Sequence, residues 1–394
     1  MLIHRETSFA QTYTSEHKGT HAARHIARHL FAISGLVGIL SLSACATRTI
    51  TPSDASATAT PTRAPAPREA PRTATQLQLI NEANALMPLA SSDIGKLFLR
   101  ATDSLPAVNT RIAYRDDNTR EFFSTAEVQT MAAERQKKLS KIELDEYRYY
   151  YTKYGSPLAY LRTLDLAASL GLTDLKGVRI LDIGYGSIGH LRLLASLGAY
   201  TVGVDPDSYL EALYSQSTDQ GAVSPARGLY RGAGGTVTLA HGRWPKDAPI
   251  VDTVTSGGPY QLILSKNTLK RGYLKPERRA PKNQLIDLGV PDDIFLRSLR
   301  EALAPSGLVI IYNLAPKQSS ADKPFLPHAD ARSPFSREQY ARAQLDIVAF
   351  DKEDNDIVRK MGALLGWDKN DKGEVTNDLT TNLFASYTIL RRKP

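Results

Sequence analysis

The sequence predicts an α/β fold with a doubly wound, mostly parallel sheet, and three observations support this. Residues 178–189 read Val-Arg-Ile-Leu-Asp-Ile-Gly-Tyr-Gly-Ser-Ile-Gly, an apolar strand that runs through a glycine-rich turn into a helix. From Val178 onward, strand patterns alternate with helical patterns. A Pro-Ser-Gly turn at 305–307 then leads into the apolar run 308–313. Alternation of this kind favours parallel strands joined through helices.

The first 44 residues read as a targeting segment and not as part of the fold. Arg24 and Arg28 precede an apolar run at 30–42, which is too short for a stable membrane-spanning helix and is typical of a signal-peptide core. The run ends in Leu-Ser-Ala-Cys at 42–45, which resembles the lipobox of bacterial lipoproteins. The resemblance implies a lipoprotein signal peptide over 1–44 and a lipid anchor on Cys45. The long, histidine-rich stretch before the apolar run leaves open a true start downstream of Met1.

Cys45 is the single cysteine of the chain, so the sequence excludes an internal disulfide and a cysteine-ligated zinc or iron–sulfur site. Ala46 follows it where an aspartate would favour retention in the inner membrane. We therefore expect a lipid-anchored protein of the bacterial cell envelope, in the outer membrane and facing the periplasm.

Two segments separate this anchor from the α/β domain. Residues 45–75 are rich in Ala, Thr, Pro, Ser and Arg without apolar periodicity, and predict a disordered tether. Residues 76–170 carry apolar side chains at helical spacing, such as Leu79 and Leu86, and predict a helical N-terminal extension. A tyrosine-rich stretch at 147–154 lies in the last third of this extension. The α/β domain is expected over 171–394.

The α/β domain contains seven candidate strands, at 178–183, 201–205, 236–240, 261–265, 308–313, 345–350 and 383–390. Candidate helices begin near Ile188, Ser208, Pro291, Ser336 and Asp354. Sheets of this type bind ligands at the carboxyl ends of their strands, near the switch in strand order.

The net charge of the chain, +8 from 49 Lys and Arg against 41 Asp and Glu, would favour anionic surfaces. We find no zinc-finger spacing and no aromatic RNA-recognition motif, so no specific nucleic-acid motif supports that partner. Scattered charges of this kind are typical of a solvated face.

The glycine-rich turn predicts a nucleotide-type cofactor. Gly184 and Gly186 allow positive φ and a close approach of the backbone to a ligand, and Gly189 allows tight helix packing. Asp205 closes the next strand, where a carboxylate accepts hydrogen bonds from a ribose diol. These glycines fit NAD as well as S-adenosylmethionine (SAM).

Three further features distinguish the two cofactors. Asp182 stands two residues before Gly184, where NAD-binding folds usually carry an apolar residue. Asp205 is followed by Pro-Asp, and the 305–307 turn precedes a long apolar strand. Together these features resemble the class I SAM-dependent methyltransferases over 171–394. The resemblance implies a seven-stranded Rossmann-like sheet whose last strand is antiparallel to its neighbour, SAM as cofactor, and a possible lid formed by the segment before the domain. Plain aromatic packing is the alternative for that segment.

The resemblance also assigns site residues. Those expected to hold the cofactor are Asp182, Gly184, Gly186, Gly189, Asp205, Trp244 and Ser265. Trp244 is equally compatible with core packing. Arg243 stands roughly where the family often has an acidic residue, a departure that affects adenine recognition.

The catalytic residues stay unknown, with Asn267, Lys266 and His190 as candidates near the expected junction of cofactor and substrate. His190 is either a base or an exposed histidine at a helix start. Lys270 and Arg271 either hold an anionic substrate or face water. The Asn/Asp-Pro-Pro-Tyr motif of enzymes that methylate base amines is absent after the fourth strand of the domain.

These patterns leave three functions open. The first is a SAM-dependent methyltransferase acting on an unidentified small-molecule or envelope acceptor, for which an exported enzyme would need a supply of SAM. The second is a catalytically inactive lipoprotein of the same fold with a binding or scaffolding role. The third, an NAD-dependent oxidoreductase, lacks a recognisable hydride-transfer site.

Overall fold

The computed structural model describes residues 71–370 and 372–393. The predicted signal peptide, Cys45 and nearly all of the tether lie outside these residues. No helix in the described ranges is long and apolar enough to cross a membrane.

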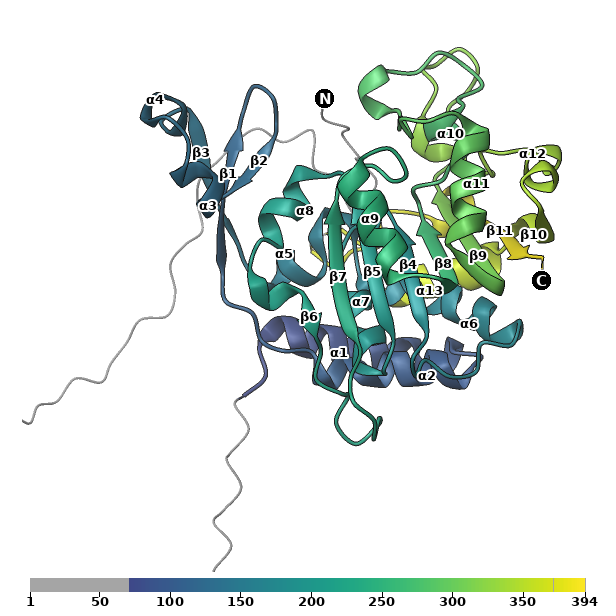
Figure 1. Ribbon diagram of the computed structural model, residues 1–394, viewed down its shortest axis with the longest axis horizontal. Coiled ribbons are helices and arrows are strands. Elements are labelled where there is room, and N and C mark those ends of the chain that lie inside the picture. The colour runs from purple at the N-terminus through teal and green to yellow at the C-terminus, as the bar shows by residue number, and fades with distance from the viewer. Residues whose placement is uncertain (1–70, 371, 394) are drawn as a thin grey trace, which may run out of the picture. The chain divides into compact units, whose positions relative to one another are not determined.

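The centre of the molecule is an eight-stranded sheet in the order β10-β11-β9-β8-β4-β5-β7-β6 (Figure 1). The strands are β4 (Arg179–Ile183), β5 (Tyr200–Asp205), β6 (Gly221–Ala222), β7 (Thr236–His241), β8 (Tyr260–Lys266), β9 (Leu303–Ala315), β10 (Leu345–Glu353) and β11 (Phe384–Arg392). β9, β8, β4, β5 and β7 pair in parallel, whereas β11 is antiparallel to both β9 and β10. The sheet is therefore mixed and mostly parallel, as predicted.

The predicted count of seven strands is wrong by one. All seven candidate strands are present, and the eighth is β6, which pairs antiparallel with β7 at the edge of the sheet. β6 has only two residues, so it leaves no periodicity in the sequence from which it could be predicted.

Helices cover both faces of the sheet. The helices of the α/β domain and its junction are α6 (Leu161–Ser169), α7 (Gly189–Ser196), α8 (Ser208–Leu213), α9 (Ala248–Gly257), α10 (Arg271–Leu274), α11 (Asp292–Ala302), α12 (Arg337–Arg342), α13 (Asn355–Leu364) and α14 (Leu379–Asn382). Alternate residues of β4 enter two separate cores, because successive strand side chains point to opposite faces. Ile180 packs with α6, α7 and α13, and Leu181 packs with α9 and α11.

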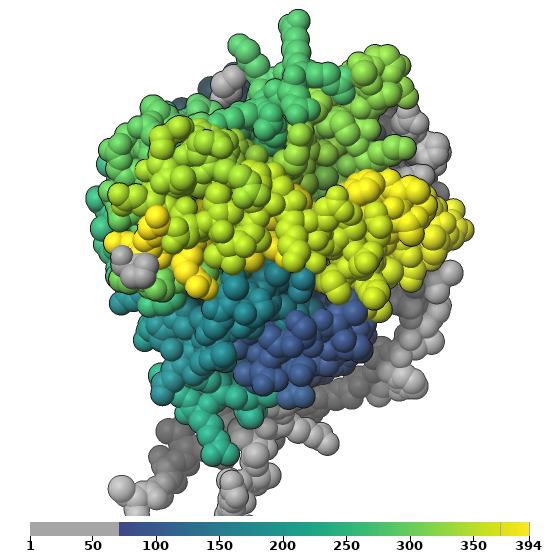
Figure 2. Space-filling view, turned by 90° about the vertical axis from the view of Figure 1, so that its right-hand side faces the viewer, coloured from purple at the N-terminus to yellow at the C-terminus, as the bar shows by residue number. Residues whose placement is uncertain are grey.

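The N-terminal extension contains helices α1 (Ala74–Leu86), α2 (Asp93–Arg100), α3 (Thr125–Gln129), α4 (Ala133–Gln136) and α5 (Glu146–Tyr150). Thr73 caps α1 in a capping box with Gln76, so the first helix begins inside the segment predicted as tether. Figure 2 shows α1 and α2 (blue) below the C-terminal part of the chain (yellow), and α1 contacts α13.

The extension also contains a three-stranded antiparallel sheet, which corrects the prediction that it is helical. The order is β2 (Phe122–Ser124), β1 (Arg111–Asp116), β3 (Leu139–Leu144). In β3, Ile142 and Leu144 alternate with charged residues, a period of two that favours a strand over a helix. At the base of this sheet, Arg111 donates two hydrogen bonds to the buried carboxylate of Asp219, at 2.5 and 2.8 Å.

Candidate functional site

The glycine-rich turn between β4 and α7 lies near the middle of the central sheet. β4 pairs with β5 on one side and with β8 on the other, so the strand order switches here, where open α/β sheets bind ligands. Gly184 and Gly186 have φ angles of 81° and 61°, a left-handed conformation that residues with a Cβ rarely adopt. The turn therefore requires glycine at both positions.

Gly189 packs differently from the prediction. A Cβ at this first residue of α7 would lie 2.8 Å from the Cβ of Pro157 and 3.5 Å from the Cδ1 of Tyr150. Gly189 thus makes room for the N-terminal extension. The tight packing of α7 on the sheet is made instead at Gly203 of β5, where a Cβ would lie 2.8 Å from Leu191 Cδ1.

Asp182 and His190 form a buried pair beneath the turn. Both side chains are 0% exposed, and His190 Nε2 lies 2.7 Å from Asp182 Oδ2. Burial lowers the pKa of His190 although Asp182 opposes the shift, so the neutral imidazole donates to the carboxylate. Tyr160 stacks on the imidazole, with ring centroids 3.6 Å apart. The interpretation of His190 as an exposed helix-start residue is therefore wrong. Asp182 Oδ1 has no hydrogen-bond partner among the described residues.

Asp205 ends β5 beside the turn and is fully buried. Its Oδ1 accepts a hydrogen bond from the backbone N–H of Asp207 at 3.1 Å. The Asp207 carboxylate in turn accepts from the Tyr154 hydroxyl and lies 2.7 Å from Lys153 Nζ. Burial acts to raise the pKa of Asp207, but Lys153 and the hydrogen bonds together hold it below its ordinary value.

The segment 151–156 fills the space over the turn. A Cβ at Gly186 would lie 3.1 Å from the Cβ and Cγ of Tyr154, and a Cβ at Gly184 would overlap the side chain of Thr268. Thr152 Oγ1 also donates to the carbonyl of Gly186 at 2.9 Å. The cavity left between this segment, the turn and the end of β8 measures about 30 Å³.

The three predicted residues at the end of β8 have different surroundings. The hydroxyl of Ser265 is buried and accepts from the N–H of Leu269 at 3.2 Å. Asn267 has φ 63° and accepts from the N–H of Leu314 at 2.7 Å, so its side chain holds the loop. Lys266 lines the small cavity. Burial lowers its pKa to about 8, although the charge of Asp182 opposes the shift.

Trp244 packs in the core. Its ring meets Phe295 of α11 edge to face, with centroids 5.7 Å apart, and it does not line the cavity at the turn. Of the two interpretations that the sequence left open, the packing supports the core residue.

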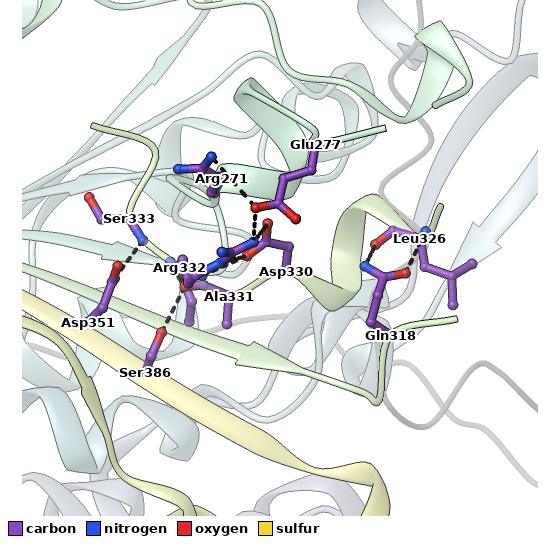
Figure 3. Close-up of polar contacts among 11 residues, drawn as sticks. Arg271, Glu277, Gln318, Leu326, Asp330, Ala331, Arg332, Ser333, Asp351 and Ser386 are labelled. Atoms are coloured by element: carbon purple, nitrogen blue, oxygen red, sulfur yellow. Dashed lines mark hydrogen bonds and ion pairs between the residues drawn. The ribbon is translucent and has the colours of Figure 1, made fainter. Parts of the chain in front are cut away.

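Lys270 and Arg271 tie two loops together beyond the ends of β8 and β9. The Lys270 ammonium is buried and donates to the carbonyls of Leu314 and His328, so it does not face water. Arg271 lies 3.7 Å from Glu277. Glu277 is also 2.8 Å from Arg332, and Figure 3 shows this acid between the two guanidinium groups.

The chemical groups at the turn suit an adenosyl ligand, but the cavity there is too small to hold one. An unpartnered buried carboxylate oxygen at Asp182, a glycine turn in the left-handed conformation and Asp205 at the end of the next strand are the groups that such a ligand uses. A drug-sized ligand needs a pocket of about 300 Å³ or more, whereas this cavity holds about one water molecule. SAM does not fit unless the segment 151–156 moves.

The sequence predicts a possible lid at the tyrosine-rich stretch 147–154, but it does not identify the contacts that close this site. Lys153, Tyr154 and Thr268 come from loops far from the turn in sequence, so no local spacing identifies their contacts. The tyrosine-rich composition at 147–154 was the one available signal.

Comparisons with known proteins gave only weak similarities. No protein-family model matches the chain, and no curated protein sequence matches it significantly. Among solved structures, a magnesium protoporphyrin IX methyltransferase from Synechocystis PCC 6803 with bound SAM is 15% identical, with TM-score 0.30, covering 59% of this chain and 79% of that one.

Two further structures cover more of the chain. The cyclase SpnF is 12% identical with TM-score 0.33, over 82% of this chain and 96% of that one. An ethanolamine-phosphate N-methyltransferase from Haemonchus contortus in complex with S-adenosylhomocysteine is 14% identical with TM-score 0.35, over 77% and 76% of the two chains. TM-scores near 0.3 are too low to support a function for this chain, so the proposals below rest on its own strand order and side chains.

Proposed function

We propose that this chain is a SAM-dependent methyltransferase, anchored to a membrane as a lipoprotein, that acts on an unidentified small-molecule or envelope acceptor. The observation that carries the proposal is the acidic-x-Gly-x-Gly turn at the strand-order switch, with Asp205 on the neighbouring parallel strand. Ligands of open α/β sheets bind at this position.

The residues at the turn have distinct proposed roles once segment 151–156 is displaced. Asp182 Oδ1 would accept from the ammonium of SAM, and Asp205 from its ribose diol. SAM itself supplies the activated methyl group. Lys266 is the candidate proton acceptor, because this residue lines the cavity and its amine has a pKa of about 8. The side chains of Asn267 and His190 are engaged by Leu314 and Asp182, which makes them supporting residues.

The test of this function is methyl transfer. Envelope fractions incubated with the protein and methyl-tritiated SAM should take up label, and the Asp182→Ala variant should lose the transfer. Asp252→Ala, which removes an exposed carboxylate on α9, is the matched control and should transfer like the parent. A parent protein that binds SAM but labels no fraction would contradict the proposed activity.

A binding or scaffolding role without turnover is the second candidate. The specific observation in its favour is the small cavity at the turn, which the protein's own Tyr154 and Thr268 reduce to about 30 Å³. In that case Asp182 would serve to hold His190 and not to hold a ligand.

A further inference from the structure

We propose that the segment 151–156 is an intramolecular plug, in which Tyr154 occupies the ligand position at the turn and must leave before an adenosyl ligand can bind. The proposal deepens the proposed function and names a regulation of the same site. It differs from a lid that closes over a bound ligand, because here the side chain and the ligand compete for one space.

The competition follows from the position of the Tyr154 ring. A Cβ built on Gly186 would lie 3.1 Å from the Cβ and Cγ of Tyr154, so the ring packs directly against the turn, and the volume that remains is about 30 Å³. The backbone of this turn cannot receive a ligand and the ring at the same time.

The plug is held by polar contacts in its middle and at its ends. In the middle, the carboxylate of Asp207 binds Lys153 and Tyr154. At the ends, Glu82 of α1 accepts from the hydroxyls of Tyr151 at 2.9 Å and Ser156 at 2.8 Å. Opening would exchange these polar contacts for water and would also withdraw the Tyr151 ring, which is 4% exposed, from the hydrophobic core.

The backbone of the plug has features that lower the cost of opening. Thr152 is β-branched and has φ 53°, a left-handed conformation that strains the backbone of such a residue. Gly155 has φ 89°, and no atom lies within 4 Å of a Cβ built on it. Thr152 and Gly155 flank Lys153 and Tyr154. The strained residue therefore lies at one end of this pair, and the flexible glycine lies at the other.

The plug is also coupled to the predicted ribose acid. Asp207, which binds the plug, donates its N–H to Asp205 Oδ1 at 3.1 Å. A ligand that engages Asp205 therefore binds the same carboxylate that positions the backbone of Asp207. Ligand binding and release of Lys153 and Tyr154 should favour each other, and a population of mostly closed molecules should reduce the apparent affinity by the open fraction.

A single engineered cysteine tests the plug without any ligand. Ser187 lines the cavity and is 4% exposed, so Ser187→Cys in the full chain with Cys45→Ser provides one thiol beneath Tyr154. We expect a thiol reagent to label it slowly, and Tyr154→Ala to accelerate labelling at least tenfold. Tyr154→Phe, which keeps the ring and removes the bond to Asp207, should accelerate it less. Tyr200→Ala changes a 45% exposed tyrosine at the other end of β5 and should have no effect.

A second arm adds S-adenosylhomocysteine to the Tyr154→Ala protein. Protection of the thiol supports both proposals. Fast labelling without protection leaves the plug standing and contradicts the SAM site. Two outcomes would overturn the plug, whatever the ligand does. One is that the protein carrying only Ser187→Cys and Cys45→Ser is labelled as fast when folded as when unfolded in urea. The other is that neither Tyr154 variant changes the rate of labelling.

Discussion

The carboxylate of Asp182 illustrates what the sequence can and cannot predict at the scale of one residue. Its place at the end of a buried strand followed from the apolar run before the glycine turn. Its partner did not, because His190 lies eight residues further on and their contact depends on how α7 is rotated against β4. The same limit applies to Trp244, whose neighbour Phe295 is remote in sequence. A residue's strand position is local information, whereas its partners are set by tertiary packing.

Lys266 should give the stability of the protein a specific pH dependence. Its pKa falls from the ordinary 10.5 to about 8 because burial disfavours the ammonium. Between these two values the unfolded chain binds more protons than the folded protein, so this group makes stability rise with pH across that window. Asp182 opposes the shift, whereas the nearby Lys270 has its own pKa lowered to about 7 by burial and by the charge of Lys266.

Replacing this ammonium by an apolar side chain should therefore stabilise the protein. Lys266→Met is expected to raise the free energy of unfolding at pH 7 by about 1–3 kcal/mol, measured by urea denaturation. The advantage should shrink as the pH rises from 7 to 10, and the exposed Lys282→Met should show neither effect. If Lys266→Met does not raise the free energy of unfolding at pH 7, or raises it equally at every pH, the lowered pKa of Lys266 is contradicted.

At the scale of elements, the strands of the central sheet with five or more residues were all predicted, and the exceptions have physical reasons. β6 is two residues long. In the extension, β1 and β3 have six residues each, but about half of these are charged or polar, so each strand lacks the continuous apolar run that marks β9. The plug over the glycine turn is held by side-chain contacts between the extension and the domain. The tyrosine-rich composition at 147–154 therefore indicated a cover over the turn, but it did not indicate that this cover fills the ligand site. The hydrophobic periodicity of the sequence predicted the fold, whereas it could not predict that the site is closed.

The extension should depend on the buried ion pair at its base. Arg111 and Asp219 have 8% and 0% exposed side chains, and the Tyr149 hydroxyl also donates to Asp219 at 2.8 Å. Arg111→Ala leaves this carboxylate without its charge partner and should cost about 3–5 kcal/mol, measured by chemical denaturation. Arg115→Ala, which removes a more exposed pair with Asp117 at 3.8 Å, should cost about 1 kcal/mol or less. Equal losses in the two variants would rule out the proposed role of the buried pair.

At the scale of the whole molecule, the proposed lipid anchor and the proposed cofactor point to different compartments, because SAM is made in the cytoplasm. The anchor rests on the sequence at 42–45 alone. A plug that keeps the site closed is compatible with a location in the cytoplasm or in the cell envelope, because the fraction of protein with bound ligand then depends on the local concentration of that ligand.

Loss of the proposed anchor should be visible by fractionation. Cys45→Ser removes the only thiol of the chain and should release the protein from the membrane fraction or stall its processing, with the lipid mass absent in mass spectrometry. Ser43→Cys in the same background moves the thiol by two positions and should not restore lipidation. Unchanged fractionation and mass in the Cys45→Ser protein would refute the lipoprotein assignment.

Calorimetric titration with SAM, S-adenosylhomocysteine and NAD tests the central claim most directly, namely that the turn between β4 and α7 is a SAM site. We predict that the protein binds SAM and S-adenosylhomocysteine but not NAD. The Tyr154→Ala variant should bind both adenosyl ligands more tightly than the parent does. Asp205→Ala should weaken binding at least about tenfold through the loss of charge-assisted hydrogen bonds, whereas Asp252→Ala should bind like the parent. Folded Tyr154→Ala protein that binds none of the three, or binding that survives Asp205→Ala unchanged, would contradict the account.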